Sequence, residues 1–116
     1  RIVIGEGTRA AAGETFLYRL LDLVAVKGRS EPLAVYEVTA RAGQLDGPRS
    51  SLLDRYATGL ALYQHRRWAE AAACFRTMQE EGMVDGPSAL YLKRSLAFIE
   101  SPPPADWNGV FVATRK

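Results

Sequence analysis

Cysteine is almost absent from this sequence, and long apolar runs are missing altogether. Cys74 is the single cysteine among 116 residues, so the chain cannot form an internal disulfide, and a reducing compartment is favoured over secretion. No run approaches the roughly 18 consecutive apolar residues that a membrane-spanning helix needs, and no signal peptide opens the chain. We therefore expect a cytoplasmic location for these residues.

A strong charge of either sign is also missing. The 15 Lys and Arg residues nearly balance the 13 Asp and Glu residues, and the formal net charge is +2. A charge this weak gives no reason to expect a nucleic-acid partner. The composition, with 47% hydrophobic and 24% charged residues, is typical of a globular protein. The length suffices for one ordinary domain or for two small pieces that share a core.

The sequence begins without methionine, in a strand-like apolar run over residues 2–4, so we expect further residues upstream. Thr8 is the expected N-cap of a short helix that runs to about Ala12 and ends at Gly13. This first part of the chain therefore predicts a strand followed by one helical segment.

Two β-favouring runs follow, Phe16–Val26 and Leu33–Val38. The six residues Lys27–Pro32 between them predict an antiparallel hairpin, with Pro32 at the strand entrance, where a missing N–H does least harm. The adjacent Leu20 and Leu21 disturb strict alternation. They predict a β-bulge or burial on both faces of the strand.

After residue 39 the composition changes, and the apolar period becomes helical. Gly, Pro, Asp and Ser predict a linker over residues 40–50. Three helical stripes are then expected over 51–101: Leu52, Leu53, Tyr56, Gly59, Leu60 and Tyr63; Ala71, Cys74, Phe75 and Met78; and Ala89, Leu92, Leu96 and Ile99. Gly82 and Gly86-Pro87 separate the helices. A Pro-rich turn and an extended, strand-like tail are expected over 102–116.

One part of the helical region resembles a known repeat. Gly59-Leu60-x-Leu62, Trp68 and Ala71-x-x-x-Phe75 line up with the tetratricopeptide repeat, in which a small residue lets two helices approach while an alanine and an aromatic ring fill the gap. Only one copy and a third helix are present, whereas about three copies normally form a stable array. The resemblance implies a single tetratricopeptide-like unit with a capping helix.

The strand region carries a more informative resemblance. Residues 1–39 contain a small helix, a long strand with an aromatic-rich start, the turn Lys27-Gly28-Arg29, and a return strand ending in Tyr36-Glu37. This combination resembles the last segment of the catalytic domain of class III adenylate and guanylate cyclases. The Pro102–Pro104 and Asp106–Val110 stretches also resemble the tails of bacterial cyclases of this class. Together with the helical region, these features predict an α+β fold.

The resemblance implies a mechanism and its partners. In this family the 3′-hydroxyl of ATP or GTP attacks its own α-phosphate, assisted by two Mg²⁺ or Mn²⁺ ions that two aspartates hold. A lysine matching Lys27 lies near the triphosphate and neutralises charge on the departing pyrophosphate, and Gly28 permits the turn that aims it. Arg29 is expected to be a solvated turn residue. The active sites of such cyclases lie at a dimer interface, so a second copy is the expected partner.

Several functional parts of that family have no counterpart in these residues. Its metal-binding aspartates, its ribose and transition-state residues, and its base-reading residues all lie upstream, where a sensor or a membrane anchor is also found in some members. Asp22 and Asp46 lack the spacing of a metal pair, so neither is assigned that role. We therefore expect residues 1–116 alone to be catalytically inactive. The choice between ATP and GTP stays open.

Three other residues are interpreted as structural. His65 is the expected C-terminal cap of a helix, Cys74 a small core residue, and Trp107 an anchor that packs the tail against the helices or the sheet. The alternative function is a non-enzymatic interaction module of the tetratricopeptide type, or a cyclase that has lost its activity. Upstream sequence with two strand-adjacent aspartates, followed by an asparagine and an arginine, distinguishes an active cyclase from both.

Overall fold

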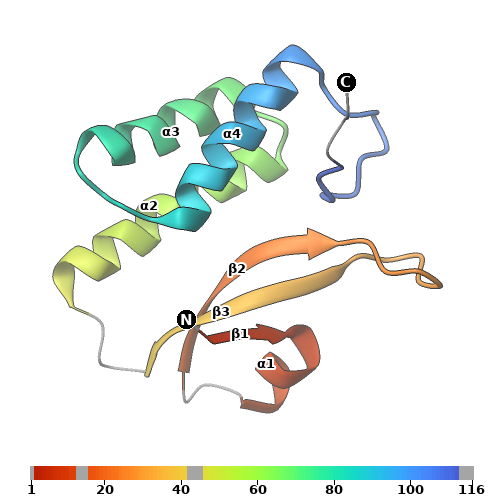
Figure 1. The fold of residues 1–116 in the computed structure, drawn as a ribbon, viewed down its shortest axis with the longest axis horizontal. Coiled ribbons are helices and arrows are strands. Elements are labelled where there is room, and N and C mark those ends of the chain that lie inside the picture. The colour runs from red at the N-terminus through yellow and green to blue at the C-terminus, as the bar shows by residue number, and fades with distance from the viewer. Residues whose placement is uncertain (1, 13–15, 42–45, 113–116) are drawn as a thin grey trace. The chain divides into compact units, whose positions relative to one another are not determined.

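A computed structural model describes residues 2–12, 16–41 and 46–112. Within those residues, three strands and four helices form a mixed α+β structure (Figure 1), so the predicted fold class is confirmed. The elements in order are β1 (Ile2–Gly5), α1 (Glu6–Ala12), β2 (Phe16–Val24), β3 (Leu33–Arg41), α2 (Gly47–Gln64), α3 (Trp68–Glu80) and α4 (Gly86–Glu100). The chain forms two compact units: residues 1–45 with 106–116, and residues 46–105.

The first unit contains an antiparallel sheet with the strand order β1-β3-β2. Strands β2 and β3 form the predicted hairpin, while β1 pairs with the other edge of β3. Strand β2 ends two residues earlier than expected, and β3 continues three residues further, to Arg41. The predicted linker is correspondingly shorter, because β3 ends at Arg41 and α2 begins at Gly47; residues 42–45 lie outside the described part.

Two β-bulges interrupt the hairpin. Leu20 pairs with Tyr36 and Asp22 pairs with Val35, which leaves Leu21 as an extra residue in β2, so the bulge predicted from the two leucines is confirmed. A second shift leaves Thr39 as an extra residue in β3, where its hydroxyl donates to the carbonyl of Leu17 over 3.0 Å. The two insertions lie on opposite strands and cancel, so the hairpin returns to its original register.

Helix α1 begins at Glu6, directly after β1, and the prediction that Thr8 is its N-cap is wrong. The two glycines did not delay the helix, and the carboxylate of Glu6 in its first turn suits the positive end of the helix dipole. The predicted end at Gly13 lies outside the described residues. Arg9 places its guanidinium carbon 5.2 Å from the ring centroid of Tyr36 and 5.6 Å from that of Tyr18, which packs α1 on one face of the sheet.

The second unit consists of α2, α3 and α4. Asp46 caps α2 by accepting a hydrogen bond from the Arg49 N–H over 2.7 Å, and Asp85 caps α4 through the Ser88 N–H over 3.1 Å. The core contains six large aromatic side chains in edge-to-face and stacked contacts: Tyr56, Tyr63, Trp68, Phe75, Tyr91 and Phe98. Gly82, with φ +85°, follows α3, and α4 ends just before Pro102–Pro104, both as predicted.

The helical stripes were predicted correctly for two helices, whereas in the third only Leu92 of the four predicted residues is buried. In α4, Ala89 is exposed, and Leu96 and Ile99 are 38% and 46% exposed. The buried residues are Pro87, Ser88, Tyr91, Leu92, Ser95 and Phe98. Two serines break the apolar pattern on the buried side, and the stacking of Tyr91 on Phe75 and of Phe98 on Tyr63 determines which way the helix faces.

The described part of the tail, residues 106–112, contains no strand, so the strand-like interpretation of this segment is wrong there. The segment forms turns because Gly109 takes φ +97° and Trp107 hydrogen-bonds within the tail. It belongs to the unit that holds the sheet. Among the described residues, no helix combines the length and apolar character that crossing a membrane requires.

Candidate functional site: a basic turn at the hairpin tip

The connection between β2 and β3 contains a four-residue turn, Val26–Arg29. The N–H of Arg29 donates to the carbonyl of Val26 over 3.1 Å, and Gly28, the third residue, has φ +88°. These are the features of a type II turn, which requires a positive φ at its third position. Nothing lies within 4 Å of where a Cβ of Gly28 would be, so backbone conformation rather than crowding explains the glycine.

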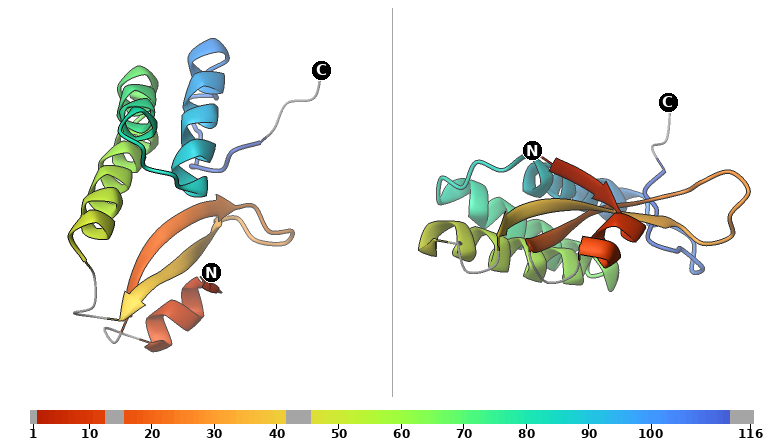
Figure 2. Two further views of the ribbon diagram at one scale, coloured as in Figure 1. Left: turned by 60° about the vertical axis from the view of Figure 1, so that its left-hand side comes forward. Right: turned by 90° about the horizontal axis from the view of Figure 1, so that it is seen from below.

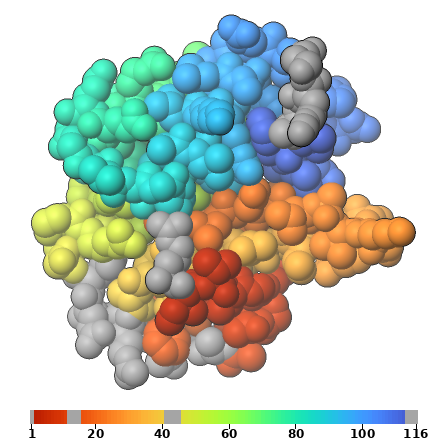
Figure 3. Space-filling view, viewed as in Figure 1, coloured from red at the N-terminus to blue at the C-terminus, as the bar shows by residue number. Residues whose placement is uncertain are grey.

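This turn presents Lys27 and Arg29 to solvent. Both residues are exposed, and neither side chain forms a hydrogen bond or an ion pair within the described part of the chain. Figure 3 shows the connection, in orange, projecting from the surface. A lysine side chain in this position can offer all three of its N–H donors to an external anion. The structure thus places Lys27 on a defined turn, while Arg29 is the solvated turn residue that was expected.

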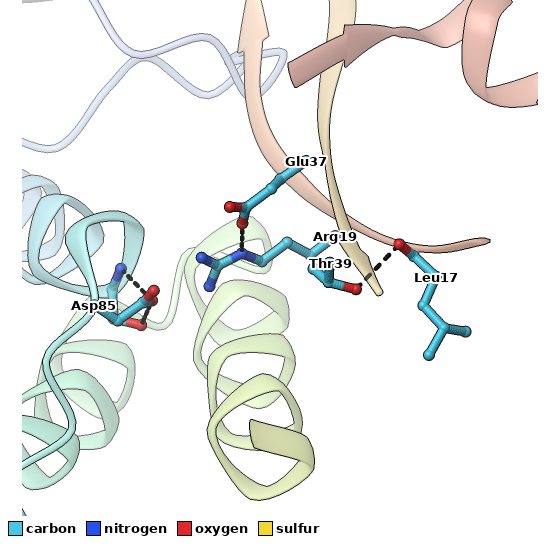
Figure 4. Close-up of polar contacts among 6 residues, drawn as sticks. Leu17, Arg19, Glu37, Thr39 and Asp85 are labelled. Carbon is cyan, nitrogen blue, oxygen red and sulfur yellow. Dashed lines mark hydrogen bonds and ion pairs between the residues drawn. The ribbon is translucent and has the colours of Figure 1, made fainter. Parts of the chain in front are cut away.

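A buried ion pair braces the hairpin behind this turn. Arg19 Nε lies 2.5 Å from Glu37 Oε1, the two side chains are only 5% and 6% exposed, and the residues face each other in the register of β2 and β3 (Figure 4). Glu37 projects from the face opposite Tyr36, hence away from the face that carries Arg9. Because breaking such a pair leaves one charge buried alone, the two residues hold the strands in one register.

No local sequence pattern indicates this ion pair. Arg19 lies inside a β-favouring run, and Glu37 belongs to the Tyr36-Glu37 pair that resembles the end of a cyclase strand. The information that would have found the pair is the strand register, which depends on the bulges at Leu21 and Thr39. Once that register is known, opposite charges directly across two strands are a favourable cross-strand pair.

The described residues do not fit a two-metal centre. No group of three or more His, Cys, Asp or Glu side chains is arranged to hold a metal ion in the part of the chain that the structure describes. Asp22 is half-buried, and its carboxylate accepts a hydrogen bond from the Leu23 N–H over 2.9 Å, while Asp46 caps α2. Each aspartate therefore has a local structural role.

The other residues weighed for chemistry also have structural places. His65 is the C-cap of α2, with Nδ1 2.8 Å from the carbonyl oxygen of Ala61. Burial raises the pKa of the Cys74 thiol, which donates to the carbonyl of Arg55, so the nucleophilic thiolate is disfavoured. Arg55 also binds Glu81 through two hydrogen bonds of 3.0 and 3.3 Å, which hold the pKa of Glu81 below its usual value.

Comparison with known proteins relates the chain to a nucleotide cyclase. It is similar to a segment of the protein named "Adenylate cyclase, terminal-differentiation specific" from Dictyostelium discoideum, with 32% identity over 111 residues. The match covers 87% of this chain and therefore includes residues of both units, but the chain spans only 5% of that protein's length. No protein-family model and no solved structure matches the sequence.

Proposed function

We propose that residues 1–39 are the closing segment of the catalytic domain of a class III nucleotide cyclase, in which Lys27 binds the triphosphate of ATP or GTP. The observation that carries the proposal is the type II turn that presents Lys27 with no ion pair among the described residues. The similarity to a segment of an adenylate cyclase supports it independently.

In the proposed reaction, the role of this chain is electrostatic. Negative charge builds up on the pyrophosphate as the α-phosphate is attacked, and a positioned ammonium group stabilises that charge most where water is excluded. Lysine suits a phosphate because it is a compact cation with three donors on a flexible stem. The Mg²⁺ or Mn²⁺ ions of such a cyclase would be held by residues outside 1–116, and the proposed role of Lys27 is separate from theirs.

The helical unit is proposed to belong to the same cyclase, as a tetratricopeptide-like appendage that supports assembly with a second copy. The match to the Dictyostelium protein extends into this unit, which favours an appendage over an unrelated module. The close packing of Gly59 against Phe75 is what a tetratricopeptide-like pair requires: a Cβ at Gly59 would lie 2.6 Å from the Phe75 ring.

A second candidate function is a non-enzymatic interaction module or an inactive cyclase. The observation that favours it is the outer side of α4, where Leu90, Leu96 and Ile99 are 41%, 38% and 46% exposed. Such a surface suits contact with another helix. This candidate predicts partner binding without any formation of cyclic nucleotide.

The two candidates are separated by an activity assay on the longest natural polypeptide that contains residues 1–116. We expect this polypeptide to convert ATP or GTP to the cyclic nucleotide and pyrophosphate in the presence of Mn²⁺, whereas residues 1–116 alone give no product. The assay quantifies cyclic nucleotide by chromatography and released pyrophosphate enzymatically. A long polypeptide that binds partners but forms no product would favour the interaction module, and product from residues 1–116 alone would contradict the assignment of the metals.

A further inference from the structure

The last described segment of the chain, Asp106–Val112, belongs to the unit that holds the sheet, although residues 46–105 separate it from the strands in sequence. Figures 1 and 2 draw this segment in dark blue beside the end of β2. We term residues 106–112 the tail clasp. Its place beside β2 raises the question of what it does for the hairpin.

The tail clasp is a closed turn. The indole Nε1 of Trp107 donates to the carbonyl of Val110 over 2.7 Å, and the Val110 N–H donates to Asn108 Oδ1 over 3.1 Å. The Trp107 side chain is half-buried. These two bonds join the two sides of the turn and so restrict its conformation.

The clasp meets β2 at Gly109. A Cβ at this position would lie 2.6 Å from Cδ1 of Leu23, which is closer than two non-bonded carbon atoms normally lie. Gly109 also has φ +97°. The positive φ favours glycine at this position, and an alanine would in addition require the end of the Leu23 side chain to shift. The contact joins the tail to one particular residue of the strand.

Leu23 lies near the end of the paired part of the hairpin, next to the β2–β3 connection. It pairs with Ala34, and the next pair, Val24 with Leu33, is the last before the connection that carries Lys27. The connection itself contains only the turn bond from Arg29 to Val26 among the described backbone bonds. How firmly the end of β2 is held therefore limits how far the Lys27 turn can move.

We propose that the tail clasp is a positioning element for Lys27. By packing Gly109 on Leu23, it holds the base of the β2–β3 connection and so limits the positions that the Lys27 ammonium group samples. The role of Lys27 in phosphate binding rests on the proposed function, whereas the restraint of the hairpin does not. Gly109 and Trp107 act through Lys27 and do not touch the nucleotide. Because the Lys27 ammonium group is already positioned, it needs little reorganisation when negative charge develops on the pyrophosphate.

Hydrogen exchange measures the restraint directly in the 116-residue chain. In Gly109→Ala, and in a chain that ends at Ala105, we expect the hydrogen-bonded amides within residues 24–33, that of Arg29 included, to exchange roughly five to ten times faster than in the unaltered chain, because the contact with Leu23 is weakened or lost. Gly82→Ala is the matched control: Gly82 has φ +85° but nothing within 4 Å of its Cβ position, and it follows α3. It should leave residues 24–33 unchanged.

Equal exchange at residues 24–33 in all four chains would overturn the proposal. Faster exchange in Gly109→Ala but not in the chain that ends at Ala105 would also overturn it, since the effect would then come from strain alone. These outcomes do not depend on whether the parent protein is a cyclase.

The coupling to Lys27 is tested in the longer polypeptide that forms cyclic nucleotide. Gly109→Ala should lower kcat/KM roughly fivefold when Lys27 is present and have no effect in a Lys27→Ala background, because a positioning residue acts only through the group it positions. An equal loss in both backgrounds would show that the clasp acts elsewhere and would contradict positioning. Failure of Lys27→Ala alone to lower the rate would contradict the proposed function and leave the exchange result standing.

Discussion

Among the described glycines, two lie where an added Cβ would come within 3.0 Å of a neighbouring side chain. Gly59 brings α2 against the Phe75 ring, and Gly109 brings the tail against Leu23. The first was predicted, because a small residue followed by a regularly spaced alanine and phenylalanine is a recognisable helix-pair pattern. The second was not, since Leu23 and Gly109 are far apart in sequence and no local pattern joins them.

Gly59→Ala tests the helix packing at the residue scale. Its Cβ would meet Phe75, whose side chain is fully buried, at 2.6 to 3.0 Å, so we expect a net loss of about 1–2 kcal/mol in the free energy of unfolding despite the better helix propensity of alanine. Urea denaturation followed by circular dichroism measures it.

Gly47→Ala is the matched control for that variant. Gly47 lies at the start of the same helix, and nothing lies within 4 Å of its Cβ position, so the change should stay within about 0.5 kcal/mol. A Gly59→Ala chain as stable as this control would show that α2 and α3 are not held at the described distance.

The functional site is also a residue-scale result, and it was only partly predictable. Lysine followed by glycine between two β-favouring runs predicts a cation on a turn, and the structure shows a type II turn with Gly28 at the position that needs a positive φ. The ion pair of Arg19 and Glu37 was missed because strand register, not residue type, brings the two charges together.

At the scale of elements, the sequence predicted the existence of each helix and strand better than its ends or its facing side. The hairpin was predicted with its bulge, because alternation fails visibly at Leu20 and Leu21. The buried side of α4 was predicted correctly only at Leu92, because Ser88 and Ser95 lie on the side that the aromatic core covers. Apolar periodicity cannot identify a stripe in which small polar residues fill the gaps between large rings.

The start of α4 gives a prediction at this scale. Asp85 accepts hydrogen bonds from the Ser88 N–H over 3.1 Å and from the Ser88 hydroxyl over 2.6 Å, so Asp85→Ala should lower the stability of the helical unit by about 1 kcal/mol. Asp85→Asn keeps an accepting oxygen and should retain most of that stability. Thermal unfolding of the two variants against the unaltered chain measures the difference, and equal losses in both would show that the oxygen does not cap the helix.

At the scale of the whole molecule, the chain comprises two units whose cores differ greatly. Among the described residues, the helical unit buries a cluster of aromatic side chains, whereas Ala34 is the only apolar residue classed as buried in the sheet unit, and Ile2 and Val3 at its edge are 62% and 50% exposed. A sheet with so small a core of its own supports the proposal that it is one segment of a larger catalytic domain. Sequence composition did not show this difference, because both halves contain similar proportions of apolar residues.

The return of the tail to the sheet unit is the other result at this scale. The sequence suggested that Trp107 anchors the tail but left its target open between the helices and the sheet. The structure groups residues 106–112 with the sheet and packs Gly109 on Leu23. Such a contact depends on the path of the whole chain, which local patterns do not contain.

The most direct test of the central claim is the rate of cyclic nucleotide formation by the longer natural polypeptide carrying Lys27→Ala, compared with Arg29→Ala two residues away on the same turn. If the Lys27 ammonium group stabilises the departing pyrophosphate, kcat/KM should fall at least about 100-fold in Lys27→Ala and change little in Arg29→Ala, while Lys27→Arg keeps part of the activity. A Lys27→Ala polypeptide that forms cyclic nucleotide at the unaltered rate would contradict the claim.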